Sequence, residues 1–156
     1  MRIVSISENK NIERRIAITP EIAKKYLSAG FEIFLSENYG DHLGIGDKSY
    51  IDLGVKISRD SKEILESSNI IAQLNLLSDE ALLNLKEGQT LVGVLNPYQN
   101  KEKIVNLRKK KINCFSLELL PRITRAQSMD ILSSQANLAG YKAVVESFAQ
   151  FEKAIP

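Results

Sequence analysis

Short apolar runs rich in β-branched residues alternate with amphipathic segments along almost the whole chain. Six of these runs are expected to form strands, at residues 2–6, 31–35, 55–57, 69–74, 90–95 and 112–117. Strands that alternate with helices are joined by crossover connections, which make neighbouring strands parallel. The pattern therefore predicts an α/β fold, with an open, flavodoxin-like or Rossmann-like parallel sheet and helices on both faces.

The segments between these runs carry helix signals. Thr19 can cap a helix that begins at Pro20, and Gly30 stands where a left-handed helix end belongs. Further helices are expected at residues 47–53, 60–67, 78–85 and 100–110. A long C-terminal helix is expected from about residue 127 to residue 153, because apolar residues recur near helical spacing from Leu132 as far as Ile155.

The two runs at residues 69–74 and 90–95 are almost continuously apolar. Runs of this kind are typical of parallel strands that are covered on both faces. We therefore expect both strands to lie in the middle of the sheet, with side chains buried on each side.

Composition narrows the class of protein. A length of 156 residues suits one domain, and 21 lysines and arginines against 19 aspartates and glutamates give too little charge to indicate nucleic-acid binding. One cysteine cannot form an intrachain disulfide, and no run approaches the ~20 apolar residues of a membrane span. With no signal peptide visible, these features favour a cytoplasmic protein.

The common catalytic and cofactor motifs are absent. The nearest approach to a dinucleotide fingerprint is residues 44–46 (GIG), but Ser49 stands where the third glycine is needed, and no P-loop is present. His42 and Cys114 share no metal-ligand spacing. Cys114 is expected to be a buried, inert residue and His42 a surface residue. The basic run at residues 108–111 is expected to be a solvated helix end rather than a phosphate or membrane site.

Two polar segments remain as candidate sites. In the first, at residues 13–20, Arg15 could bind an anionic group or form a structural ion pair with Glu13. Both interpretations stay open.

The second polar segment, at residues 121–137, follows the last predicted strand, at the sheet edge where open α/β proteins bind ligands. Gln127, Asp130 and Ser133 recur every three residues, so on a helical turn they share roughly one face, and Arg122 could pair with Asp130. A loop with a helix-capping cluster is the alternative interpretation.

A family resemblance lies in these same residues. Residues 121–142 (PRITRAQSMDILSSQANLAGYK), together with residues 13–20 (ERRIAITP), resemble the alpha subunit of proton-translocating NAD(P) transhydrogenase. Alanine dehydrogenase is a more distant relative that shares the pattern of residues 15–20. The resemblance implies that residues 1–156 form the N-terminal subdomain of the NAD(H)-binding component, with the Gly-rich NAD-binding subdomain expected after residue 156.

The activity that this resemblance implies is hydride transfer between NADH and NADP⁺, coupled to proton translocation. The loop that lies over the nicotinamide in that family corresponds to Arg122, Gln127 and Asp130 as catalytic residues, with Ser133 as a further cofactor-binding residue. No metal is implied, since hydride transfer needs only well-placed nicotinamide rings.

The implied cofactors and partners are those of the family. NAD(H) would bind this component and NADP(H) a partner subunit. The expected partners are the rest of the alpha subunit, a second copy in a homodimer when complete, and the NADP(H)-binding and membrane-spanning subunits. These would hold the protein at the cytoplasmic side of the inner membrane, and the isolated chain is expected to be inactive.

Two alternatives remain. An alanine-dehydrogenase-like enzyme is disfavoured, because that family has a substrate-binding lysine after the strand at 69–74 and a catalytic histidine after the strand at 90–95. This chain has Asn75 and residues 96–98 (NPY) there. A non-catalytic flavodoxin-like binding module would leave the polar residues between Arg122 and Asn137 unexplained.

Overall fold

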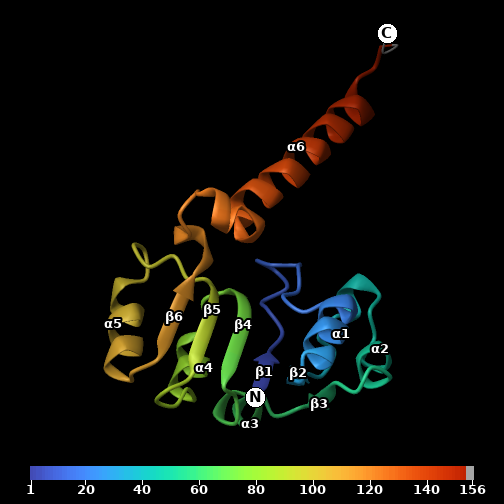
Figure 1. The fold of residues 1–156 in the computed structure, drawn as a ribbon. Helices are drawn as coiled ribbons and strands as arrows, with labels where there is room; N and C mark the ends of the chain where they lie inside the picture. Colours follow the sequence, from blue (N-terminus) through green and yellow to red (C-terminus); the bar gives the residue numbers. More distant parts are fainter. Residues whose placement is uncertain (154–156) are drawn as a thin grey trace. The chain divides into compact units, whose positions relative to one another are not determined.

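The computed structural model describes residues 1–153. The chain forms two compact units, Met1–Ser116 and Leu117–Pro156. The first unit contains the whole sheet and the second contains the long C-terminal helix (Figure 1).

The sheet of the first unit has six parallel strands. They are β1 (Arg2–Ser5), β2 (Glu32–Ser36), β3 (Lys56–Ser58), β4 (Ile70–Asn75), β5 (Thr90–Val94) and β6 (Asn113–Ser116). Their order is β3-β2-β1-β4-β5-β6, so the direction of winding reverses between β1 and β4. This is the Rossmann order, and the predicted fold class is confirmed.

The connecting helices of the first unit begin where the capping signals predicted. They are α1 (Pro20–Ser28), α2 (Asp47–Ile51), α3 (Ser61–Glu66), α4 (Asp79–Leu83) and α5 (Lys101–Lys109), with a 3₁₀ turn, η1 (Asp41–Leu43), before α2. The Thr19 hydroxyl accepts from the backbone N–H of Ile22 at 3.3 Å. Gly30 follows α1 with a φ of +85°, as its predicted role at the helix end requires.

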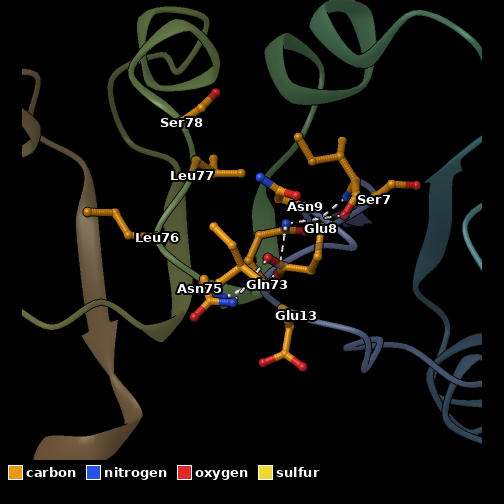
Figure 2. Close-up of a pocket in the computed structure, with 11 residues that line it drawn as sticks. Ser7, Glu8, Asn9, Glu13, Gln73, Asn75, Leu76, Leu77 and Ser78 are labelled. Carbon is orange, nitrogen blue, oxygen red and sulfur yellow. Dashed lines mark hydrogen bonds between the residues drawn. The ribbon is translucent and has the colours of Figure 1, made fainter.

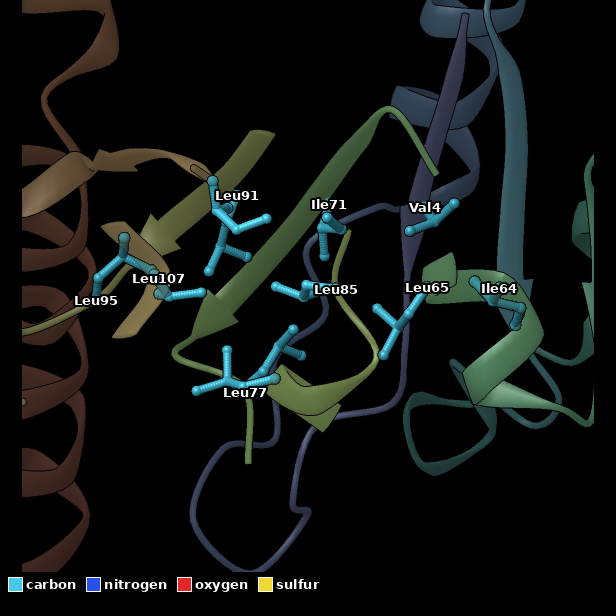
Figure 3. Close-up of a cluster of buried hydrophobic side chains, with 11 residues drawn as sticks. Val4, Ile64, Leu65, Ile71, Leu77, Leu85, Leu91, Leu95 and Leu107 are labelled. Atoms are coloured by element: carbon cyan, nitrogen blue, oxygen red, sulfur yellow. The ribbon is translucent and has the colours of Figure 1, made fainter. Parts of the chain in front are cut away.

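Each face of the sheet carries its own core. On one face, α3, α4 and α5 contribute to a cluster around β4 and β5, part of which Figure 3 shows; its buried members are Val4, Ile64, Leu65, Ile71, Leu77, Leu82, Leu85, Leu91, Leu95, Leu107 and Ile112. On the other face, α1 and α2 cover the half of the sheet formed by β1, β2 and β3; the buried members are Ile3, Ile18, Ala23, Ile33, Leu35, Tyr39, Tyr50 and Val55.

Burial of the middle strands is one-sided, which differs from the expectation of two covered faces. In β5, Leu91 and Gly93 are buried, whereas Val92 and Val94 are only half-buried. The reason is that α1 and α2 lie over the other half of the sheet, and the core on their face contains no residue of β5 or β6. The prediction of a buried Cys114 is wrong, because β6 is an edge strand and Cys114 is exposed.

Two strands approach each other very closely at Gly93. The pairing of β4 with β5 shifts register between Ala72 and Asn75. At this irregularity a Cβ atom on Gly93 would lie 2.5 Å from the carbonyl oxygen of Gln73. A backbone oxygen cannot move away cheaply, so only glycine fits here.

The second unit contains two 3₁₀ turns, η2 (Leu117–Leu119) and η3 (Thr124–Met129), followed by α6 (Ile131–Gln150). The predicted helix from residue 127 to residue 153 is therefore shorter at both ends, because Asp130 adopts an extended backbone conformation and caps α6. Ile155 lies outside the described residues. No residue of α6 is buried. Among the described residues, no helix is both long enough and apolar enough to span a bilayer.

Candidate functional site

The four site residues predicted from the sequence come together in the second unit. A cavity of about 270 Å³ is lined by Arg122, Ile123, Thr124, Gln127, Asp130 and Ser133. Gln127 lies on the 3₁₀ turn η3, Asp130 at the break that follows it, and Ser133 in the first turn of α6. The expected shared face therefore forms across two helical elements rather than along one helix.

Asp130 is the most constrained of these residues. Its Oδ1 accepts from the backbone N–H groups of Leu132 and Ser133 at 3.0 and 3.1 Å, and its Oδ2 accepts from the Ser133 hydroxyl at 2.6 Å. These hydrogen bonds, the one from the Ser133 hydroxyl foremost, hold the pKa of Asp130 below its usual range. Asp130 thus stays ionised and fixes the break between η3 and α6.

Arg122 stands on the open side of the cavity. Its Nε lies 3.9 Å from Oδ2 of Asp130, so the predicted pair is present, although at a long distance. The Arg122 side chain is 69% exposed, against 16% for Asp130. An exposed pair of this length contributes little to stability, and the guanidinium keeps most of its hydrogen-bonding capacity for a ligand.

Gln127 completes the set with an exposed side-chain amide. Its backbone carbonyl accepts from the N–H of Asp130 at 3.3 Å, which orients the turn. The cavity therefore offers a cationic donor, an amide that both donates and accepts, and a carboxylate with its hydroxyl. A nicotinamide carboxamide, which also donates and accepts, fits this set of groups.

The single histidine and the single cysteine take no part in a metal site. No cluster of three or more metal-ligating side chains occurs within residues 1–153. His42 uses Nε2 to donate to the carbonyl of Arg14 at 2.6 Å, which ties the segment before α1 to the turn η1.

Arg15 is engaged by a neighbouring carboxylate. Its Nε lies 2.8 Å from Oε1 of Glu13, and its Nη2 contacts Oε2 of the same side chain. The hydrogen bond from Arg15 lowers the pKa of Glu13. Of the two interpretations left open by the sequence, the ion pair with Glu13 is confirmed.

Sequence reasoning missed a second cavity, which lies at the carboxyl ends of β1 and β4 (Figure 2). It has a volume of about 460 Å³ and includes Glu8, Asn9, Glu13, Gln73 and Asn75 in its lining. The winding of the sheet reverses at this point, which is where open α/β folds usually bind ligands. Its lining includes carboxylates and amides but no lysine or arginine.

Glu8 organises this second cavity. Its Oε1 accepts from the backbone N–H groups of Leu74 and Asn75 at 2.8 and 3.2 Å and from Nε2 of Gln73 at 3.2 Å. Its Oε2 accepts from Nδ2 of Asn75 at 3.3 Å. Gln73 was the available signal, because it is a lone polar residue inside an apolar strand.

Comparison with known sequences follows the same residues. The sequence model described as "Alanine dehydrogenase/PNT, N-terminal domain" matches residues 5–139. In Rickettsia prowazekii, the first of the proteins that make up NAD(P) transhydrogenase subunit alpha is 40% identical over 160 residues, which cover 100% of this chain and 42% of that protein. The chain is 38% identical to NAD(P) transhydrogenase subunit alpha of Haemophilus influenzae, covering 89% of this chain and 27% of the relative.

Solved structures agree with this result. The crystal structure of transhydrogenase from Sinorhizobium meliloti matches with a TM-score of 0.89 and 34% identity, over 99% of this chain and 46% of that one. An L-alanine dehydrogenase matches with a TM-score of 0.71 at 20% identity, over 76% of this chain and 32% of that one, which shows a shared fold. The predicted resemblance is confirmed, and the chain spans less than half the length of these relatives.

Proposed function

This chain belongs to the family of the alanine dehydrogenase/PNT N-terminal domain, and we propose that it is the N-terminal part of the NAD(H)-binding alpha subunit of a proton-translocating NAD(P) transhydrogenase. The relatives that match most of the chain at 30% identity or more are named as alpha subunits of this enzyme. The reaction is hydride transfer between NADH and NADP⁺.

The observation that carries the proposal is the cavity around Arg122, Gln127, Asp130 and Ser133. The spacing of these residues in the sequence groups them, and in the fold they line one cavity. Its exposed donors and its ionised, fully hydrogen-bonded carboxylate suit the positioning of a polar ring substituent.

The residues of this chain would act by positioning. A bound NADH supplies the hydride, and the transfer needs no protein base. Arg122 and Gln127 offer the groups that would contact the nicotinamide carboxamide. Asp130 holds the turn on which Gln127 stands, through its bonds to the first turn of α6. Ser133 keeps that carboxylate ionised and in place.

The remaining cofactors and partners follow from this assignment. NADP(H) would bind a partner subunit, and a Gly-rich NAD-binding subdomain would supply the pyrophosphate grip that this chain lacks. The complete alpha subunit would be a homodimer. Membrane-spanning subunits would carry the protons and hold the complex on the cytoplasmic side of the inner membrane.

An alanine-dehydrogenase-like activity fits less well. The cavity between β1 and β4 has carboxylates and amides in its lining but no lysine or arginine, and Arg15 is paired with Glu13. A substrate carboxylate would meet like charge there. A non-catalytic binding module would not require four polar residues to converge on one cavity.

The test replaces Gln127→Asn in the complete transhydrogenase complex. Asparagine keeps the amide but withdraws it by one methylene, so we expect the rate of hydride transfer to NADP⁺ to fall about tenfold or more, since transfer requires a closely defined ring position. The dissociation constant of NADH should change by less than about threefold. Stopped-flow absorbance measures the rate, and calorimetry measures NADH binding.

The matched control is Gln99→Asn, at an exposed position in the first unit. It should leave both quantities unchanged. A wild-type rate in the Gln127→Asn complex would remove the positioning role from this cavity. NADH formation that depends on alanine would favour the alternative enzyme.

A further inference from the structure

The sequence of β5 is that of a strand covered on both sides, but the structure covers only one. Leu91 and Leu95 are fully buried beneath the helical layer of α3, α4 and α5. Val92 and Val94 point to the opposite face and remain half-buried. The same alternation occurs in β4, where Ile71 is buried and Ala72 is not.

These half-buried residues form a continuous apolar surface. Pairing of the strands places Ala72 of β4 opposite Val92 of β5, and Val92 opposite Phe115 of β6. The three side chains therefore form one row across three strands. With Leu74 and Val94, which lie on the same face by alternation, this row defines the open face of the sheet.

The open face contains no charged residue, and it is not a normal solvent surface. Phe115 is 58% exposed. No helix of Met1–Ser116 contributes to a core beside β5 and β6 on this side. A parallel sheet is usually covered on both faces, and its exposed apolar area indicates an interaction surface.

We propose that the open face is the docking surface for an amphipathic helix supplied by the polypeptide outside residues 1–156. The inference rests on the proposed function, since the alpha-subunit relatives are more than twice as long as the matched segment. A helix is the occupant that the face favours, because small and β-branched side chains such as Ala72, Val92 and Val94 leave a shallow surface for its apolar stripe.

The first experiment uses the full-length alpha subunit that contains this chain. A photoreactive p-benzoylphenylalanine replaces Phe115, and the crosslinked peptides are identified by mass spectrometry. We expect crosslinks to one helical peptide outside residues 1–156. Crosslinks confined to residues 1–156, or no crosslink at all, would overturn the proposal.

The second experiment compares Phe115→Glu with Val105→Glu, at a solvent-exposed position of α5. In the full-length subunit, Phe115→Glu should lower the unfolding midpoint by about 5–10 °C, because it buries a charge, and Val105→Glu by less than about 2 °C. In the isolated chain, both variants should unfold within about 2 °C of the wild type, since Phe115 is exposed there. Equal shifts for Phe115→Glu in the two contexts would contradict the proposal.

A second copy of the chain is the other occupant to exclude. If the wild-type full-length subunit dimerises and Phe115→Glu makes it monomeric in sedimentation, the open face is a subunit interface and the proposal is wrong. Failure of the proposed function is distinguishable: a full-length subunit that gives the expected crosslink but whose complex shows no hydride transfer would refute the function alone.

Discussion

Gln73 connects three segments of the first unit through one buried side chain. Its Oε1 accepts from the Ser5 hydroxyl at 2.7 Å and from the N–H of Ile6 at 2.9 Å, and its Nε2 donates to the carbonyl of Ile6 at 3.2 Å. Replacing Gln73→Met keeps the volume but leaves these buried groups without a partner. We expect the free energy of unfolding to fall by about 2–4 kcal/mol in urea titrations, against less than about 0.5 kcal/mol for the exposed Gln99→Met.

Glu13 and Arg15 make a pH-dependent contribution at the residue scale. The hydrogen bond from Arg15 lowers the folded-state pKa of Glu13. The pair therefore stabilises the fold fully above about pH 4.5, the ordinary value of a glutamate, and this stabilisation is lost as the pH falls through the lowered pKa.

Replacing Arg15→Ala should raise the pKa of Glu13 toward its ordinary value, as measured by carboxyl NMR titration. The difference in unfolding free energy between wild type and variant should shrink as the pH is lowered below about 4. A Glu13 titration curve that does not move in the variant would show that Arg15 is not the cause of the shift.

Residue types and spacing predicted the cavity around Asp130, but not the one around Glu8. Arg122, Gln127, Asp130 and Ser133 lie within twelve residues of chain, so local spacing is enough to group them. Glu8 meets Gln73 and Asn75 across more than 60 residues, at the reversal of strand order. That reversal depends on which strands pair, and a periodicity argument does not fix the pairing.

At the scale of elements, the two faces of β5 should respond differently to truncation. Leu91 is fully buried, so Leu91→Ala should destabilise the isolated chain by about 2–5 kcal/mol. Val92 is only half-buried, and Val92→Ala should cost less than about 1 kcal/mol. Chemical denaturation of both variants measures the contrast. Similar losses at the two positions would show that the open face is covered in the isolated chain.

Element positions were predictable because their signals are local. All six strands and the helix beginning at Pro20 lie where periodicity and capping placed them. The start of the last helix was missed by four residues, since Asp130 competes for the backbone N–H groups of the first turn and ends the 3₁₀ turn before it. Such competition is visible only once side chains are placed.

At the scale of the whole molecule, the two units should differ in local stability. None of the 20 residues of α6 is buried, and a helix of this length gains little stability without packing. We expect amide hydrogens of α6 to exchange with solvent at least about 100-fold faster than those of β4 and β5 in the isolated chain. Equal protection in the two regions, measured by mass spectrometry, would contradict this expectation.

The close approach at Gly93 has a consequence for how this chain can vary. Because a methyl group there would overlap the carbonyl oxygen of Gln73, a saturation library of the β5 codons should return glycine alone at position 93 under selection for folding. Its neighbour Val92 should accept many aliphatic replacements. The middle of the strand would thus contain an invariant point beside a permissive one, set by the spacing of two backbones rather than by any reaction.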